Sequence, residues 1–238
     1  SGKTILSIGL SAALNKLGKS VQTFKKGPDY IDPMWLSKAS KKPCRNLDFH
    51  FMNPNQIVLE FKKFSKYNDY LIVEGNKGLF DGLSLNGSDS NAALAKLLKV
   101  PVILIIDTRG MTRGIAPLLL GQINFDEDIN IIGTVLNQVG GSRHEKKLCA
   151  AIEKYTNIPV LGSIPQSKDL QIIERHLGLM PANEHRNTSK TISIIENIIQ
   201  KNVDLTAIGD LTKRDDIDFF EHKDLPPPIE RIKKKVTI

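Results

Sequence analysis

Short, almost wholly apolar runs alternate with helix-like segments along most of this chain, and this alternation constrains the fold more than any other feature. Residues 101–106 read Pro-Val-Ile-Leu-Ile-Ile and residues 70–73 read Tyr-Leu-Ile-Val, and an acidic residue follows each run. Strands that are apolar on both faces are typical of parallel sheets covered by helices on both sides. The alternation therefore predicts an α/β fold with a doubly wound, mostly parallel sheet and helices on both faces.

The same patterns place the individual elements. Strands are expected over 21–24, 70–74, 101–106, 130–136 and 159–164, and helices over 2–17, 55–64, 91–98, 111–120, 143–155 and 188–201. In such a fold, ligands bind beyond the carboxyl ends of the strands. We therefore expect the polar side chains at those ends to converge on one crevice with Thr4: Lys25, Asp29, Asp32, Glu74, Asp107 and Asn137.

The chain opens on Ser1-Gly2-Lys3-Thr4, which matches the last four positions of the phosphate-binding loop motif G-x-x-x-x-G-K-[ST]. Leucines follow at helical spacing, so the motif begins an amphipathic helix, where backbone N–H groups and the helix dipole favour phosphate. Gly2, Lys3 and Thr4 are thus candidate nucleotide-binding residues. Lys3 would reach the β- and γ-phosphates of ATP, and the Thr4 hydroxyl would ligate Mg²⁺. The alternative is a basic helix start that binds no ligand.

The front of this motif and the strand that should precede it are not in the sequence. We therefore expect an N-terminally truncated chain whose first strand is missing. At the other end, Leu225-Pro226-Pro227-Pro228 is typical of an extended linker, since consecutive prolines favour polyproline II. The expected division is a P-loop domain over 1–202, a linker region over 203–230 and the start of a further domain over 231–238.

Composition narrows the classes of function. The net charge is +7, but the lysines are spread along the chain and form no basic stripe interleaved with aromatic residues. Nucleic-acid binding is therefore disfavoured against phosphate-rich ligands. Cys44 and Cys149 are isolated thiols, which indicates a reducing, cytoplasmic location. No apolar run approaches the roughly 20 residues that span a bilayer, so no membrane partner is expected.

Charged side chains follow the strands where a nucleotide would lie. Mg²⁺ prefers hard oxygen ligands and usually keeps several waters, so Thr4, Glu74 and one aspartate, Asp29 or Asp32, are the candidate metal ligands. We take Asp32 as that aspartate. Lys25 would neutralise phosphate oxygens during phosphoryl transfer, which makes Lys25, Asp29 and Asp32 the candidate catalytic set. Turn formation is the alternative for both aspartates, and a surface position is the alternative for Lys25.

Other polar residues carry weaker signals. The amide of Asn137 offers a donor and an acceptor and would read the adenine edge of ATP, although an asparagine that closes a turn explains the position nearly as well. Arg143 and His144 begin a helix and face either a ligand or solvent. Lys26 is expected at the surface, and His176 lacks any metal-ligand pattern nearby.

Several longer motifs follow one another in order. They are Phe24 to Pro33 (F-K-K-G-P-D-Y-I-D-P), Arg45-Asn46-Leu47-Asp48, the loop from Glu74 to Gly82, Asp107-Thr108-Arg109-Gly110-Met111 and Glu174 to Leu179. On these motifs, residues 1–182 resemble the cobyrinic acid a,c-diamide synthase family. The chain would be the N-terminal ATP-binding synthetase domain of such a protein, truncated at both ends.

The resemblance implies a P-loop NTPase-like fold of the dethiobiotin-synthetase type and an ATP-dependent, glutamine-hydrolysing amide ligase. Such enzymes phosphorylate the a and c acetate side chains of a corrin-type tetrapyrrole, and a C-terminal glutaminase domain supplies the ammonia that displaces phosphate. A carboxylate is a poor acylating agent, so phosphorylation provides the leaving group. The implied partners are therefore a corrinoid substrate and ammonia from a glutaminase domain outside this chain, with a homodimer as one arrangement.

The resemblance also implies roles by position. Lys3 and Thr4 match the P-loop, and Lys25, Asp29 and Asp32 match the loop that faces both nucleotide and substrate. Glu74 matches a strand-end acid that helps to hold Mg²⁺, and Asn137 matches a position near the base. These seven positions and Gly2 form the expected site. Cys44 is not expected to be catalytic.

Two alternatives stay open. Within the family, the substrate is cobyrinic acid, hydrogenobyrinic acid or nickel-sirohydrochlorin, and the motifs do not separate them. From another class, a nucleotide-switched P-loop ATPase of the partitioning or metal-chaperone type shares the architecture. The acidic G-P-D-Y-I-D-P loop argues against a switch, because a switch needs no pair of acids facing a substrate.

Overall fold

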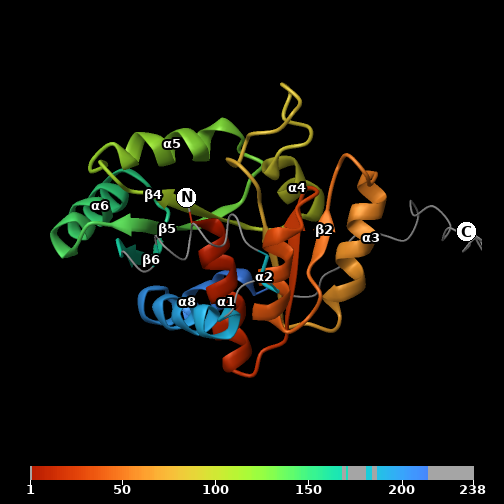
Figure 1. Cartoon of the computed structure of the whole chain (residues 1–238). Coiled ribbons are helices and arrows are strands. Elements are labelled where there is room, and N and C mark those ends of the chain that lie inside the picture. The colour runs from red at the N-terminus through yellow and green to blue at the C-terminus, as the bar shows by residue number, and fades with distance from the viewer. Residues whose placement is uncertain (1, 168–169, 171–180, 184–186, 214–238) are drawn as a thin grey trace, which may run out of the picture.

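The computed structural model describes the chain except for residues 1, 168–169, 171–180, 184–186 and 214–238 (Figure 1). The described strands form two three-stranded parallel sheets with the orders β2-β1-β3 and β4-β5-β6. The strands are β1 (Val21–Lys26), β2 (Arg45–Leu47), β3 (Tyr70–Glu74), β4 (Val102–Asp107), β5 (Ile131–Val139) and β6 (Val160–Pro165).

Helices connect the parallel strands, as a parallel sheet requires. They are α1 (Lys3–Lys16), α2 (Ile31–Ser40), α3 (Pro54–Ser65), α4 (Asn91–Leu98), α5 (Ile115–Phe125), α6 (Ser142–Tyr155), α8 (Thr188–Asn202) and α9 (Leu205–Thr212). Figure 1 shows α1 between α2 and α8, and α1 contacts both of them. None of the helices within the described part of the chain is long and apolar enough to cross a membrane.

The strands are covered on both faces, which confirms the predicted fold class. In β4, Ile103 and Ile105 pack against the core of α1, α2 and α8, whereas Leu104 and Ile106 belong to the core beneath α5 and α6. In β3, Ile72 faces the first of these cores, and its neighbours on either side pack against the core of α3 and α4. Alternate side chains of a strand point to opposite faces, so an apolar run fills two cores at once.

Helix α1 ends where the sequence predicted. Gly18 has φ +78°, and its N–H donates to the carbonyl of Asn15, while the N–H of Lys19 donates to the carbonyl of Leu14. This pair of bonds is the Schellman motif, which needs a left-handed residue after the helix. Halfway along the helix, a Cβ on Gly9 would lie 2.2 Å from Cγ1 of Ile199, so a glycine lets α1 approach α8 closely.

Several predicted elements have other bounds in the structure, and some elements were missed. Helix α5 begins at Ile115 rather than Met111, because residues 108–114 form turns around Gly110, which has φ +68°. Strand β5 continues through Asn137 to Val139 instead of ending at 136. Helix α2 and strand β2 were not predicted, since α2 carries a proline in its first turn and β2 has three residues.

The segment expected to be a linker begins with folded structure. Val203 forms an antiparallel bridge with Gly162, and α9 follows, with Ile208 buried in the same core as α1. Residues 214–230, the prolines among them, and 231–238 lie outside the described residues, as does the motif from Glu174 to Leu179. The division into domains therefore stays a prediction, with packed structure extending to Thr212.

Candidate active site

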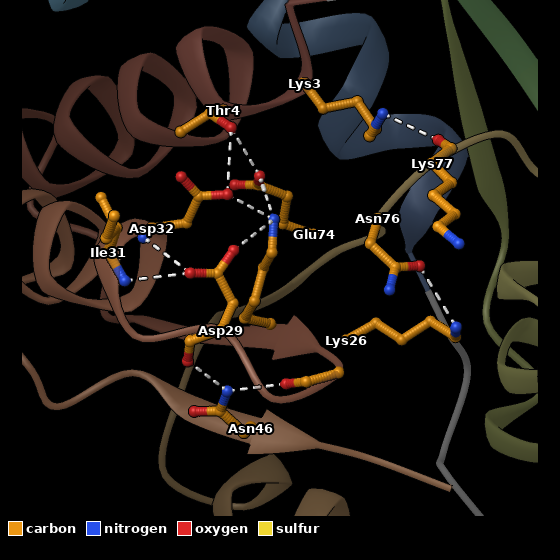
Figure 2. Close-up of polar contacts among 12 residues, drawn as sticks. Lys3, Thr4, Lys26, Asp29, Ile31, Asp32, Asn46, Glu74, Asn76 and Lys77 are labelled. Atoms are coloured by element: carbon orange, nitrogen blue, oxygen red, sulfur yellow. Dashed lines mark hydrogen bonds and ion pairs between the residues drawn. The ribbon is translucent and has the colours of Figure 1, made fainter. Parts of the chain in front are cut away.

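Lys25 lies among three carboxylates near the carboxyl ends of β1 and β3. Figure 2 shows these acids, Asp29, Asp32 and Glu74, close together. Its ammonium donates to Asp32 Oδ2 at 2.5 Å and to Glu74 Oε1 at 2.8 Å, and Asp29 Oδ2 lies 3.7 Å away. The parallel register pairs Lys25 with Glu74, which brings the two side chains together from neighbouring strands. The Lys25 side chain is only 5% exposed, so this is a buried ionic site rather than a surface one.

Thr4 joins the same cluster from the first turn of α1. Its hydroxyl donates to Glu74 Oε1 at 2.7 Å and lies 3.4 Å from Asp32 Oδ2. Glu74 Oε2 is buried and has no hydrogen-bond partner among the described residues. The structure thus brings together Thr4, Lys25, Asp29, Asp32 and Glu74, as the strand-end argument predicted.

The charges in the cluster shift one another's pKa. Burial raises the pKa of Glu74 above its ordinary value, and the Lys25 charge only partly counters this effect. Burial alone would lower the pKa of Lys25, but the Glu74 charge and the hydrogen bonds to Asp32 and Glu74 raise it overall. Lys25 is therefore held as a cation.

Asp29 has a local structural role as well. Its Oδ1 accepts hydrogen bonds from the N–H groups of Ile31, at 2.9 Å, and Asp32, at 3.3 Å, so it stabilises the turn that leads into α2. Asp29 therefore forms a turn, as the alternative interpretation predicted, and also lies close to Lys25. Asp32 lies within the first turn of α2, and its side chain is 15% exposed.

The residues that match the P-loop motif contact the loop after β3 and the strand β5. Lys3 Nζ donates to the carbonyl of Lys77 at 2.8 Å, and burial lowers the pKa of Lys3. Gly2 has φ +89°, and a Cβ there would lie 2.2 Å from Nδ2 of Asn137. Asn137 therefore packs directly against the backbone of the P-loop, where only glycine fits without displacement.

The donor set suits Mg²⁺. One hydroxyl and two carboxylates, those of Thr4, Asp32 and Glu74, gather within one cluster, and the buried Oε2 of Glu74 lacks a protein partner in the described structure. Among the described residues, no group of three His, Cys, Asp or Glu side chains is arranged to hold a metal ion by itself. Mg²⁺ commonly takes one or two carboxylates together with phosphate oxygens and water, so these residues fit it.

Sequence reasoning missed two residues at this edge of the sheet. Lys26 was expected at the surface but is buried, donates to Asn76 Oδ1 at 3.2 Å and has a pKa lowered by burial. Asn46 donates from Nδ2 to the carbonyls of Gly27 and Asp29, both at 2.7 Å, and so supports the acidic loop. The motif that contains Asn46 was visible in the sequence, but only the β1–β2 register shows that it faces Lys25.

The remaining candidates have contacts with other residues. Asp107 pairs with Asn137 in the β4–β5 ladder, and its carboxylate binds Arg109 through Nη2 at 2.6 Å, which lowers the pKa of Asp107. His144 accepts a hydrogen bond at Nδ1 from the N–H of Gly140 and lies 2.6 Å from the carbonyl of Met111 through Nε2. Arg143 lines an open hollow of about 410 Å³ whose lining residues all belong to α6.

Comparison with known proteins adds sequence relatives. A cobyrinate a,c-diamide synthase of Magnetococcus marinus is 47% identical over 208 residues, which are 87% of this chain and 44% of that protein. A cobyrinate a,c-diamide synthase of Methanosarcina acetivorans is 43% identical over 215 residues, covering 86% of this chain and 43% of that protein. The chain thus spans less than half the length of these relatives.

Two solved structures share the fold at low identity. A MinC:MinD cell division protein complex from Aquifex aeolicus matches with a TM-score of 0.52 and 13% identity, over 92% of this chain and 95% of that one. Chloroplast FtsY from Physcomitrella patens matches with a TM-score of 0.51 and 14% identity, over 90% of this chain and 62% of that one.

Residues 1–179 match the CobQ/CobB/MinD/ParA nucleotide binding domain. The chain is thus similar over most of its length to proteins named cobyrinate a,c-diamide synthase, and it belongs to the CobQ/CobB/MinD/ParA nucleotide-binding domain family.

Proposed function

We propose that this chain is the ATP-binding, carboxylate-activating part of a cobyrinate a,c-diamide synthase. The proposed reaction is the ATP-dependent amidation of the a and c acetate carboxylates of a corrin-type tetrapyrrole, with ammonia supplied by glutamine hydrolysis in a separate domain. The observation that carries the proposal is the buried cluster of Lys25, Asp32, Glu74 and Thr4 next to the residues that match a P-loop motif. The identity to enzymes named for this reaction supports it.

The proposed chemistry has two steps. A substrate carboxylate oxygen attacks the γ-phosphorus of ATP, ADP leaves, and an acyl phosphate forms. Ammonia then attacks the acyl carbon, inorganic phosphate leaves, and a proton is lost from nitrogen to give the amide. Phosphoryl transfer depends mainly on positioning and on neutralising charge, which is what a fixed set of cations can provide.

The side chains of the cluster divide these tasks. Lys3 and Lys25 place two ammonium groups beside the phosphates, and Lys25 is held in position by Asp32 and Glu74. Thr4, Asp32 and Glu74 would hold Mg²⁺, which supplies charge neutralisation at the phosphate oxygens when bound. Asn137, against the P-loop backbone, would contact the nucleotide base.

The first test identifies the reaction and its substrate. The full-length product of the gene that carries this sequence is incubated with Mg-ATP, glutamine or ammonium, and either cobyrinic acid or nickel-sirohydrochlorin. A product one mass unit lighter for each amidated carboxylate, up to two, identifies the ligase and its substrate. No change of mass, together with ATP hydrolysis stimulated by a protein or DNA partner, favours the nucleotide-switched ATPase instead.

Asp32→Asn tests the role of the acidic loop. The variant keeps the shape of the side chain but removes its charge from Lys25, so we expect ATP binding within a few-fold of native and amide formation reduced by roughly a hundredfold. Asp128→Asn is the matched control, because Asp128 has an 83% exposed side chain. Unchanged amidation by Asp32→Asn would show that the assigned role is wrong.

A further inference from the structure

The side chain of Asn91 makes three hydrogen bonds to the loop that follows Glu74. Asn91 is the first residue of α4, and its Oδ1 accepts a hydrogen bond from the N–H of Asn76 at 3.2 Å. Its Nδ2 donates to the carbonyl of Asn76 and, at 2.7 Å, to the carbonyl of Gly78. One amide thus binds both ends of the three-residue segment Asn76-Lys77-Gly78.

This segment connects to the candidate active site at both of its sides. It begins two residues after Glu74, and the carbonyl of Lys77 accepts the hydrogen bond from Lys3 Nζ (Figure 2). Lys77 has φ +42°, a left-handed conformation that a lysine adopts only when its surroundings impose it. The position of the Lys77 carbonyl, and with it that of Lys3, therefore depends on what fixes its two neighbours.

The contact between Asn91 and the loop is close as well as polar. A Cβ on Gly75 would lie 2.7 Å from Oδ1 of Asn91, so the amide packs directly on the backbone next to Glu74. An asparagine amide presents acceptor and donor groups in one plane, which matches one N–H and two carbonyls. An aspartate there would oppose two carbonyl oxygens with a carboxylate oxygen.

We propose that Asn91 is a positioning residue for the reaction, a role that rests on the function proposed above. Asn91 acts through the backbone of residues 75–78, which it fixes so that Glu74 and Lys3 keep their places around the phosphates. The role differs from a structural one because α4 has its own N-terminal cap. The hydroxyl of Ser90 accepts the hydrogen bond from the N–H of Ala93 at 3.1 Å.

The test compares Asn91→Asp with Asn15→Asp in the full-length protein. Asn15 has the same chemistry elsewhere: its Nδ2 donates to the carbonyls of Ser11 and Ala39, near the end of α1 that lies far from Lys3. Both variants lose two donors to carbonyls. Amidation kinetics and the amide hydrogen exchange of residues 75–78 are measured for native protein and both variants.

We expect Asn91→Asp to lower kcat about tenfold or more, to change KM for the tetrapyrrole less than about threefold, and to speed exchange at residues 75–78. Asn15→Asp should keep the native kcat. Equal kcat in Asn91→Asp and native protein, or equal losses in both variants, would overturn the positioning role. A native protein that amidates no substrate would overturn the proposed function and the positioning role together. This outcome differs from a failure of the positioning role alone, because it is seen in the native protein before any variant is compared.

Discussion

At the residue scale, Lys25 shows that a buried charge is stable only when charges of opposite sign are buried next to it. Its ammonium is almost fully removed from water, which alone would favour the neutral amine, yet Glu74 and Asp32 raise its pKa. Glu74 is buried too, and it depends on Lys25 in return. Removing one partner from such a pair leaves an uncompensated buried charge, so these side chains function and fold as a unit.

The reactivity of Cys44 tests the expectation that this cysteine is not catalytic. Burial raises the pKa of its thiol from an ordinary value of 9.0 to about 11. Since only the thiolate is nucleophilic, the folded protein at pH 9 should carry roughly 1% of Cys44 as thiolate, against about half for an ordinary thiol. Alkylation of Cys44 by iodoacetamide should therefore be slow at pH 9 and accelerate toward pH 11.

The control for Cys44 is the same peptide alkylated in guanidinium chloride, where the thiol should react at the ordinary rate. Mass spectrometry of the two samples separates Cys44 from Cys149, whose pKa burial also raises. Fast alkylation of Cys44 in folded protein at pH 8 would contradict the expectation and reopen a catalytic role for this residue.

At the element scale, the turns that end α1 and connect its neighbours set where the site residues lie. The helix that begins at Lys3 must end before Gly18 so that β1 can start at Val21. Lys25 then lies near the carboxyl end of that strand. The left-handed Gly18 makes that stop possible. Replacing glycine by alanine should therefore lower stability where the glycine is left-handed and raise it where the glycine lies inside a helix.

Gly18→Ala and Gly121→Ala test this contrast. Neither glycine has an atom within 4 Å of an added Cβ, so packing does not differ between them. Gly18 has φ +78°, and alanine there should lower the free energy of unfolding by about 1 kcal/mol. Gly121 lies within α5, and alanine there should raise that free energy by roughly 0.5–1 kcal/mol.

Chemical denaturation of the two variants and native protein provides the comparison, with the slope of the transition checked for constancy. Changes of the same sign in both variants would contradict the assigned conformations.

At the scale of the whole molecule, one core joins the two sheets. Side chains of β3, β4, β5 and β6 all pack against the cluster that contains α1, α2 and α8, so the P-loop helix is buried between both halves. Helix α9 adds Ile208 to this cluster, and Val203 bridges to β6. Residues after 202 therefore belong to the packed structure up to Thr212.

Truncation tests that extension. A chain that ends at Asn202 loses Val203 and Ile208, both buried, and the hydrogen bond from the N–H of Asp204 to the carbonyl of Leu161. It should be less stable than a chain ending at Lys213 by about 3 kcal/mol, the order expected for exposing two buried aliphatic side chains. Equal melting temperatures for the two chains would show that α9 is dispensable and restore the boundary at 202.

Prediction from sequence succeeded where the local hydrophobic pattern agrees with how the element packs in the tertiary structure. β3 and α4 begin and end as the pattern predicted, because a buried strand and an amphipathic helix are repetitive signals. It failed for β2, whose three residues are too few for a period, and for Lys26, whose burial depends on neighbouring loops. The identity of the strand-end side chains was predictable, whereas the Asn91 and Asn46 contacts were not.

By itself, the sequence determined the fold class, the order of those strands and helices that have a clear hydrophobic period, and which polar residues end the strands, because these follow from hydrophobic period and chain direction. Only the tertiary structure decided that Lys25 sits between Asp32 and Glu74, that Asn137 packs on Gly2, and that Asn91 holds the loop behind Glu74. Those contacts join residues far apart in the chain. They depend on strand register and helix packing, which no local pattern encodes.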